Sequence, residues 1–495
     1  MMTLSLRLLF AVWLSVVSGS NNNNNKQPNI VFILADDYGF NDIGYHGSQI
    51  STPNLDQLAS DGVKLENYYV QPICSPTRGQ LMSGRYQVNF YFGKFSFCYF
   101  FFCSRSCCRD ELLPPKGLRK TIFHGSVQGG RRRDRLRQKK RWEDDVGEWT
   151  AMKLRNTLRK AESREEWKRY VVICYLTGSE NYTDHMRAFT PSGKYYLDLR
   201  DNNGPVHNES GHYSAHLFTE KAIDVVQAHD HSKASNVPLS SSSGMVSALD
   251  EGVGNFTQAL KDKGLWDNTI LVFSTDNGGE TYSGGNNFPL RGRKFTLWEG
   301  GLHGVGFVTG GRLPVKGLVS NELIHVSDWF PTLVGLAQGS LNGTKPLDGF
   351  DMWDTISRGT PSERTVLLHN IDPLFPKRGV PLYNDTFDTS VRAAVRVGDM
   401  KLITGDPGKG KWIPPPGQKP ERDPDGHNSD KNVWLFNITA DPTEHHDLSG
   451  QMPETVRTLL GYLERFNETA VPAHFPHFDM MSNPAKNGGI WGPWK

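Results

Sequence analysis

The stretch Asn29-Ile30-Val31-Phe32-Ile33-Leu34-Ala35-Asp36-Asp37 decides the fold class of this 495-residue chain. Its apolar and β-branched residues follow one another without polar alternation, which predicts a strand buried on both faces, as in a parallel sheet. Open α/β folds bind their ligands at the carboxyl edge of the sheet, so Asp36 and Asp37 are candidate cation ligands. A solvated turn is the alternative, because adjacent acids are common after a strand.

A second stretch repeats this arrangement. The sequence Thr269-Ile270-Leu271-Val272-Phe273-Ser274-Thr275 predicts another buried strand, and Asp276-Asn277-Gly278-Gly279 follows it. The two strand ends together offer three carboxylates and one amide, which are hard oxygen ligands suited to Ca²⁺ or Mg²⁺. The sequence shows no Cys/His cluster with zinc spacing that would compete with this interpretation.

The rest of the pattern predicts an α/β domain over residues 27–360 and a smaller domain over residues 361–495. Up to about residue 360, helical segments alternate with strands; we expect helices at 51–59, 244–264 and from 326, and a strand at 303–308. Beyond it, short strands between Gly, Pro and Asp clusters predict a small antiparallel sheet; they lie at 366–369, 392–396, 400–404 and 433–437, before a last helix at 453–466.

The N-terminus has the pattern of a secretory signal peptide over residues 1–20, followed by an Asn-rich leader at 21–26. Its apolar run is too short to span a bilayer comfortably, and no other segment qualifies as a transmembrane helix. The net charge of +2 gives no case for a nucleic-acid partner. Seven Asn-x-Ser/Thr sequons agree with the secretory pathway; they lie at Asn181, Asn208, Asn255, Asn342, Asn384, Asn437 and Asn467.

The sequence Cys74-Ser75-Pro76-Thr77-Arg78 offers a nucleophile-grade side chain beside a guanidinium, on a Pro-fixed turn that runs into a predicted helix. An anion could bind there between backbone N–H groups and Arg78. A buried free cysteine in an ordinary turn is the alternative. If Cys74 is modified, five cysteines remain, and this odd number leaves at least one thiol unpaired or intermolecular.

Three parts of the chain, residues 27–88, 175–226 and 244–495, resemble the sulfatase family, and within it the animal arylsulfatases B, I and J. The most specific stretches are 35–39, the signature Cys-x-Pro-Ser/Thr-Arg at 74–78, 274–279 and 284–301, and they occur in the order of the family pattern. The resemblance implies an alkaline-phosphatase-like α/β fold with a central mixed, mostly parallel sheet and a small C-terminal antiparallel α+β domain. The α/β domain would be the catalytic one.

The resemblance also implies site roles. Asp36, Asp37, Asp276 and Asn277, with residue 74, would bind Ca²⁺, Arg78 would steady the aldehyde hydrate, and Lys294 would contact sulfate. A formylglycine-generating enzyme in the endoplasmic reticulum would oxidise Cys74 to Cα-formylglycine before folding. One hydroxyl of the hydrated aldehyde would attack the sulfur of a sulfate ester, and the other would expel sulfate and regenerate the aldehyde. Without this context, a basic surface loop explains residues 289–294 equally well.

The implied activity is hydrolysis of aryl sulfates or sulfated glycans, with N-acetylgalactosamine 4-sulfate of glycosaminoglycans as the expected group. The implied destination is lysosomal or extracellular. A catalytically dead protein that binds sulfated glycans is one alternative. The other is an alkaline-phosphatase-like phosphodiesterase, which uses Thr or Ser with two transition metals, and the cysteine at position 74 argues against it.

Two pieces of the family pattern are missing. Residues 89–174 lack the Gly-Lys-Trp-His-Leu-Gly stretch whose Lys and His hold sulfate and the formylglycine hydroxyl, and they carry instead a cysteine cluster and a basic run at 131–141. Between residues 227 and 244 the family has a strand and a His that protonates the leaving group, for which His229 and His231 are poor substitutes. An error in the gene prediction, a degenerate paralogue and a true insertion that binds polyanions are the three explanations. The chain as written is expected to be impaired.

Overall fold

The computed structural model of the chain describes residues 27–89, 244–419 and 430–473, together with the strand segments 171–177, 187–189, 195–197, 200–201 and 204–205 and the single positions 219, 220, 223, 421, 486 and 488. The signal peptide, the leader, the sequons Asn181 and Asn208, the basic run at 131–141 and the pair His229 and His231 lie outside the described residues.

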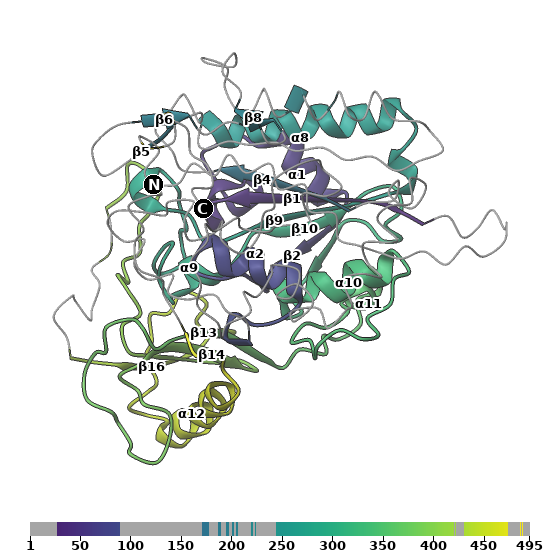
Figure 1. Cartoon of the computed structure of the whole chain (residues 1–495). Coiled ribbons are helices and arrows are strands. Elements are labelled where there is room, and N and C mark those ends of the chain that lie inside the picture. Colours follow the sequence, from purple (N-terminus) through teal and green to yellow (C-terminus); the bar gives the residue numbers. More distant parts are fainter. Residues whose placement is uncertain are drawn as a thin grey trace.

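The central sheet has the strand order β11-β2-β10-β9-β1-β4 (Figure 1). The strands are β1 (Asn29–Asp36), β2 (Val63–Leu65), β4 (Val171–Thr177), β9 (Thr269–Thr275), β10 (Gly306–Thr309) and β11 (Leu318–Ser320). β1 runs parallel to β4 and β9, β11 runs parallel to β2, and β10 is antiparallel to both of its neighbours. The prediction of a mixed, mostly parallel sheet is therefore confirmed.

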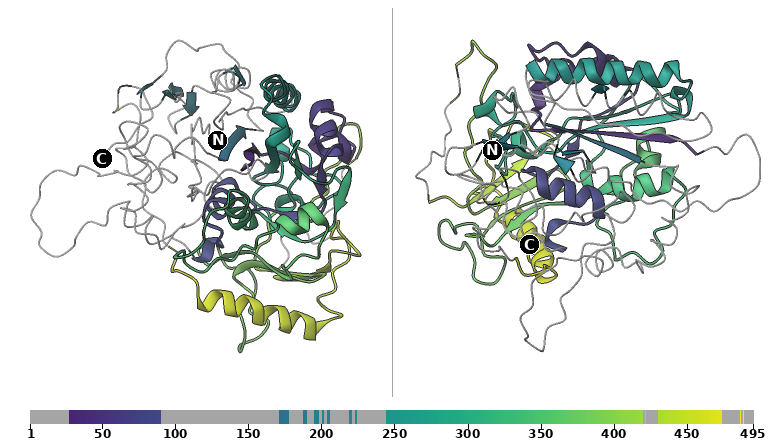
Figure 2. Two further views of the ribbon diagram at one scale, coloured as in Figure 1. Left: turned by 90° about the vertical axis from the view of Figure 1, so that its right-hand side faces the viewer. Right: turned by 45° about the horizontal axis from the view of Figure 1, so that its top comes forward.

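Residues of β1 point alternately to the two faces of this sheet, and each face has its own core. On one face, Val31 and Ile33 pack with apolar residues of α1 (Pro53–Ser60) and α8 (Gly244–Asp262). Figures 1 and 2 show these two helices lying side by side over that face. The continuous apolar sequence of β1 thus reflects burial on both sides, as the pattern predicted.

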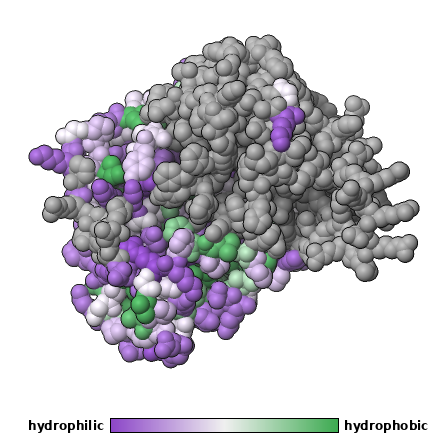
Figure 3. Space-filling model, turned by 60° about the vertical axis from the view of Figure 1, so that its left-hand side comes forward, coloured by the Kyte–Doolittle hydropathy of each residue, from purple (hydrophilic) through white to green (hydrophobic). Residues whose placement is uncertain are grey.

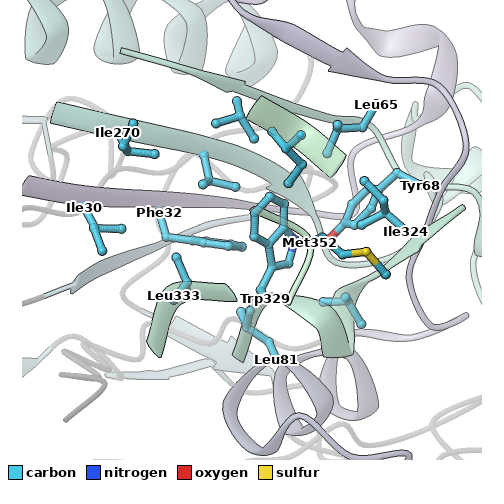
Figure 4. Packing of buried hydrophobic residues seen from close by; sticks show 14 of the residues in the cluster. Ile30, Phe32, Leu65, Tyr68, Leu81, Ile270, Ile324, Trp329, Leu333 and Met352 are labelled. Atoms are coloured by element: carbon cyan, nitrogen blue, oxygen red, sulfur yellow. Dashed lines mark hydrogen bonds between the residues drawn. The ribbon is translucent and has the colours of Figure 1, made fainter. Parts of the chain in front are cut away.

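The opposite face packs against α2 (Cys74–Ser83), α10 (Trp329–Leu336) and α11 (Trp353–Arg358). Trp329 is central to this core: its ring meets Phe32 edge-on at 5.6 Å, and its Nε1 donates to the hydroxyl of Tyr68 at 2.9 Å (Figure 4). Leu81 of α2 packs in the same cluster. The helix that begins at Cys74 is therefore held to this second face of the sheet by its own apolar residues.

The C-terminal region forms a separate antiparallel sheet of four strands in the order β13-β14-β15-β16. Its elements are β13 (Val366–Asp372), β14 (Arg392–Val397), β15 (Met400–Thr404), β16 (Val433–Asn437) and α12 (Pro453–Glu468). One face packs on α12, which Figures 1 and 2 show on the outside of the molecule. The other face packs on Leu297 and Trp298 of the preceding region. All four predicted strands and the last helix are confirmed within a few residues.

Smaller elements complete the described chain. They are β3 (Tyr68–Tyr69), β5 (Arg187–Phe189), β6 (Tyr195–Leu197), β7 (Arg200–Asp201), β8 (Gly204–Pro205), β12 (Ile324–His325), α9 (Glu299–Leu302), and the 3-10 helices η1 (Phe40–Asp42), η2 (Gly44–His46), η3 (Gln87–Asn89), η5 (Trp266–Asn268), η6 (Thr281–Ser283) and η7 (Val326–Asp328). On the face in Figure 3 the described residues are mainly hydrophilic, with small groups of hydrophobic ones. None of the described helices combines the length and the apolar content that a membrane span requires.

Candidate active site

The ends of β1 and β9 bring the predicted oxygen ligands together, because the two strands are parallel neighbours with Ala35 opposite Thr275. The backbone N–H of Asp37 donates to Oδ1 of Asp276 at 3.2 Å, and Nδ2 of Asn277 donates to Oδ1 of Asp37 at 2.8 Å. Asp37 has a φ of 59°, a left-handed conformation that is uncommon outside glycine and is often found at functional sites. Both predicted acidic strand ends therefore converge on one buried point.

Cys74 begins α2 at the same point. Its Sγ and carboxylate oxygens of Asp36 and Asp276 all lie within 4.8 Å of one another. Thr77 fixes this turn, because its hydroxyl accepts from the backbone N–H of Gln71 at 2.9 Å and donates to the carbonyl of Asp276. The first-turn N–H groups of α2 also give this end of the helix a partial positive charge.

Burial raises the pKa of the Cys74 thiol well above its usual range, and Lys294 and Arg78 offset only part of this shift. The thiolate is the nucleophilic form of cysteine. An unmodified Cys74 is therefore a neutral, weakly nucleophilic thiol in this environment.

Two cations lie among the carboxylates. Nη2 of Arg78 is 3.1 Å from Oδ2 of Asp36 and 2.8 Å from Oδ2 of Asp276, and Nζ of Lys294 donates to Asp37. Burial is the largest single influence and acts to lower the pKa of Lys294, but the neighbouring Asp37, Cys74, Asp36 and Asp276 together outweigh it and raise the pKa above its usual value, so this ammonium stays charged. The predicted cations thus bind the predicted acids directly.

The charges in this cluster do not balance, because three carboxylates face two cations. Burial and the neighbouring Asp36 raise the pKa of Asp276, which shows the mutual repulsion of the acids. Within the described part of the chain, Oδ1 of Asp36 and Oδ1 of Asn277 are buried and accept no hydrogen bond. Leaving such acceptors unpaired is costly, and a hard divalent cation would satisfy both oxygens. The residues present therefore fit a Ca²⁺ or Mg²⁺ ion.

Asn287 and the glycines near it help to position the site, and our interpretation of the sequence assigned them no role. The side chain of Asn287 accepts from the N–H of Gly279 at 2.8 Å and donates to its carbonyl at 3.0 Å. A Cβ on Gly278 would lie 1.9 Å from the carbonyl oxygen of Gly300, so only glycine fits there. The dense polar and glycine sequence at 276–287 was the available signal.

The structure brings together seven predicted site residues: Asp36, Asp37, Cys74, Arg78, Asp276, Asn277 and Lys294. Their individual roles stay predictions. Of the described sequons, the asparagines at 255, 342, 384 and 467 are exposed, and Asn437 is half-buried and accepts from the N–H of Ala440 at 3.0 Å.

Comparison with solved structures shows the fold. The crystal structure of Ps i-CgsB in complex with k-i-k-neocarrahexaose covers 92% of this chain and 95% of its own, with a TM-score of 0.60 and 21% identity. A phosphonate monoester hydrolase from Silicibacter pomeroyi has a TM-score of 0.51 at 14% identity and covers 90% of this chain and 96% of its own. Since these identities are low and the second protein is named for a different activity, the likeness shows the architecture alone.

Comparison of sequences is more specific. The family model described as Sulfatase matches residues 28–96 and 175–340, so the match is interrupted within the segment that departs from the family pattern. Arylsulfatase J of Mus musculus is 37% identical over 515 residues, which cover 95% of this chain and 80% of that protein. The N-acetylgalactosamine-6-sulfatase of Homo sapiens is 25% identical and covers 70% of this chain and 69% of its own. The signature at Cys74, the acidic strand ends and this identity together place the chain in the sulfatase family of sulfuric ester hydrolases.

Proposed function

We propose that this chain is built for formylglycine- and calcium-dependent hydrolysis of sulfate esters, with Cys74 as the formylglycine precursor. The observation that carries the proposal is the buried convergence of Cys74 with Asp36 and Asp276, beside two acceptor oxygens that receive no hydrogen bond from any residue the structure describes. A neutral thiol in this place is a weak nucleophile, whereas a hydrated aldehyde supplies a hydroxyl for attack on sulfur.

In this proposal the cation is Ca²⁺, held by Asp36, Asp37, Asp276 and Asn277 together with residue 74, and it supplies positive charge that polarises the bound sulfate. The protein cluster alone has one more carboxylate than cation and would repel an anion. Lys294 is positioned by a hydrogen bond from its own N–H to the carbonyl of Gly279 at 3.2 Å, and its ammonium would bind a sulfate oxygen. Arg78 would orient the hydroxyl groups at residue 74.

We further infer that the chain as written turns over slowly or not at all. The sequence lacks the Lys and His that follow the family signature and the His expected near residue 240. Loss of one group that stabilises developing charge costs about a hundredfold to a thousandfold, and loss of a general acid costs about a hundredfold or more. These losses are not additive, but together they leave little activity.

For the substrate we propose N-acetylgalactosamine 4-sulfate of glycosaminoglycans, with aryl sulfates as small test substrates. For the location we propose the secretory pathway, with a lysosomal or extracellular destination, on the basis of the N-terminal pattern and the exposed sequons. The formylglycine-generating enzyme of the endoplasmic reticulum would then meet the chain before Cys74 becomes buried.

The first experiment is to sequence the transcript from the codons of Tyr86 to Asp250 and to express what it encodes with the formylglycine-generating enzyme. Mass spectrometry of the peptide that contains residue 74 reports conversion, and an aryl sulfate assay against Cys74→Ala reports turnover. If the printed chain is converted and turns over as fast as a version with a Gly-Lys-x-His stretch, the inferred impairment is wrong. If the complete version has no Cys74-dependent turnover, the proposed activity is wrong.

A second candidate is a sulfatase-fold protein that only binds sulfated glycans, through Lys294 and the basic run at 131–141. The charged composition of that run favours this candidate. Retention on heparin that disappears with salt and with deletion of the run, in a protein without turnover, would support it. A phosphodiesterase remains disfavoured, since a cysteine occupies the position of the nucleophile.

A further inference from the structure

An aromatic side chain lies on the surface next to the proposed sulfate-binding loop. Tyr282, in η6, is 67% exposed, although it follows the ligand Asn277 by only five residues. Its ring is covered on one side by the guanidinium of Arg293, whose Cζ is 4.2 Å from the ring centroid. Arg293 directly precedes Lys294 in the chain, so the ring borders the segment that carries the proposed sulfate-binding lysine, and we call this border the rim.

The buried side of Tyr282 is held in place by its neighbours in the loop. Arg293 is only 4% exposed and forms a salt bridge with Glu280 at 2.6 Å, and the side chain of Glu280 accepts from the N–H of Tyr282 at 3.1 Å. The backbone of this loop is also held, since the N–H of Gly285 donates to the carbonyl of Glu280 at 3.1 Å. An exposed aromatic ring on a rigid base is a low-entropy contact surface.

The C-terminal region adds a cation to this rim. Lys409 is exposed, and its Nζ donates to the hydroxyl of Tyr282 at 3.2 Å. The loop that carries Lys409 is anchored on the segment that contains Lys294: the N–H of Gly292 donates to the carbonyl of Lys411 at 3.0 Å, and Nε1 of Trp298 donates to the carbonyl of Gly408 at 3.0 Å.

A buried guanidinium strengthens this anchor. Arg291 is sandwiched between Trp298 and Trp412, with its Cζ 3.6 and 4.7 Å from the two ring centroids. Its Nε also donates to the carbonyl of Gly410 at 3.0 Å. Lys409 is therefore held beside Tyr282 by a fixed loop and not by its own flexible side chain alone.

We propose that Tyr282 and Lys409 form a saccharide subsite for the sugar next to the one whose sulfate is cleaved. The exposed part of the Tyr282 ring, with Arg293 over it at 4.2 Å and Nζ of Lys409 farther out at 5.7 Å from its centroid, suits the C–H face of a pyranose. Lys409 suits the carboxylate or sulfate of that neighbouring sugar. The inference rests on the proposed function, since it names the polymeric, anionic class of substrate for the same site. A substrate with one sugar would not reach this subsite.

The test is a titration of the full-length chain with a chondroitin 4-sulfate hexasaccharide and, separately, with inorganic sulfate, at one ionic strength. Tyr282→Ala is expected to weaken hexasaccharide binding about tenfold and Lys409→Gln about threefold to tenfold, with the Lys409 effect shrinking at high salt. Affinity for inorganic sulfate should fall less in each variant. Lys316→Gln, which removes the same charge from another exposed lysine, is the matched control and should bind as the unaltered chain does.

The outcomes separate the two proposals. Unchanged hexasaccharide affinity in both variants, or no measurable hexasaccharide binding by the unaltered chain, overturns the subsite whether or not aryl sulfates are cleaved. Selective loss of hexasaccharide affinity without any turnover supports the subsite and counts against the activity of the printed chain. Equal loss for hexasaccharide and inorganic sulfate would also overturn the subsite, because both variants would then be disturbing the catalytic centre.

Discussion

Two buried charge clusters in this protein differ in one respect. At the candidate active site, Oδ1 of Asp36 and Oδ1 of Asn277 accept no hydrogen bond within the described part of the chain. In the second cluster, Glu299, Lys401 and Glu444 are fully buried, and each carboxylate oxygen accepts a hydrogen bond. Both clusters have one more carboxylate than cation among these groups. Between these two clusters, unpaired acceptor oxygens, and not buried charge as such, are what sets the candidate ligand site apart.

The second cluster joins the two parts of the molecule. Nζ of Lys401, on β15, lies 2.7 Å from Glu299 of α9 and 2.8 Å from Glu444. Glu299 also accepts from the hydroxyl of Tyr69 at 2.7 Å, and Glu444 accepts from the N–H of Glu299 at 2.7 Å. All of these donors and acceptors are protein groups. We therefore expect mutations in this cluster to change the free energy of unfolding, and mutations in the active-site cluster to change the binding of a ligand.

The largest effect is expected for Lys401→Met. This change keeps much of the side-chain volume but leaves Glu299 and Glu444 buried without their shared cation. Breaking a buried ion pair by removing one partner costs about 3–5 kcal/mol. Chemical denaturation should show this loss in the free energy of unfolding, whereas Lys316→Met, at an exposed lysine, should change it by less than about 0.5 kcal/mol. A loss below about 1 kcal/mol would mean that the cluster is not a structural unit.

The two clusters also differ in how far the sequence predicted them. The active-site acids could be predicted, because β1 and β9 read as uninterrupted apolar runs and each run ends at its acids. Glu299, Lys401 and Glu444 could not, since they lie far apart in the sequence and each alone resembles a surface charge. The position of Tyr282 beside Lys409 could not be predicted from the sequence either, because it depends on how one loop packs on another.

Pairing of β4 with β1 was also not predictable. The strand Val171–Thr177 begins inside the segment that departs from the family pattern, and that pattern resumes only at Tyr175. A strand of a parallel sheet requires only a run of β-branched and apolar residues, which Val171-Val172-Ile173 supplies. The edges of the aberrant segment, taken from family resemblance, therefore do not coincide with the edges of the structural element.

The second prediction concerns Ca²⁺, to which only the active-site cluster should respond. At a free concentration of about 100 times its Kd, a ligand that binds only the folded state adds about 2.7 kcal/mol of stability. Thermal unfolding with Ca²⁺ and with a chelator should show this shift for the unaltered chain. Asp36→Asn, which keeps the shape of the side chain but removes its charge, should lose most of it.

Two controls sharpen this measurement. Glu444→Gln alters a carboxylate of the other cluster and should keep the full response to Ca²⁺. Because carboxylates crowd the active site, Asp36→Asn should also cost little stability when the chelator is present. An equal response to Ca²⁺ in Asp36→Asn and the unaltered chain would contradict the assignment of this site.

The third prediction is a pH dependence that belongs to the structural cluster. Burial raises the pKa of Glu444 from 4.5 to about 7, and Glu299 adds to the rise while Lys401 opposes it. Between these two pH values the folded chain binds more protons at Glu444 than the unfolded chain does. Stability from this group is therefore present below about pH 4.5 and is lost as pH rises to about 7, on the order of 2 to 3 kcal/mol.

The readout is the difference between the unaltered chain and Glu444→Gln. Burial lowers the pKa of His325 and of His369, which adds an opposite slope below about pH 6.5 in both proteins. Gln cannot accept from the N–H of Glu299 with its amide nitrogen, so the variant will lose some stability at every pH. Its free energy of unfolding should nevertheless fall less between pH 5 and pH 8, and parallel curves for the two proteins would refute the role given to Glu444.

The smallest effect is expected for Tyr69→Phe, which removes one donor to the structural cluster. The partners of Tyr69 keep other hydrogen bonds: Oε1 of Glu299 still accepts from Lys401, and Nη1 of Arg396, which donates to the Tyr69 hydroxyl at 2.6 Å, also donates to Asn67 at 3.0 Å. The expected loss in the free energy of unfolding is therefore about 1 kcal/mol, near that of an ordinary hydrogen bond. Tyr38→Phe, which removes a hydrogen bond of 3.0 Å to the carbonyl of Asp42 in the main core, is the matched control. A loss above about 3 kcal/mol for Tyr69→Phe alone would show that the remaining hydrogen bonds of the structural cluster do not compensate for the missing hydroxyl.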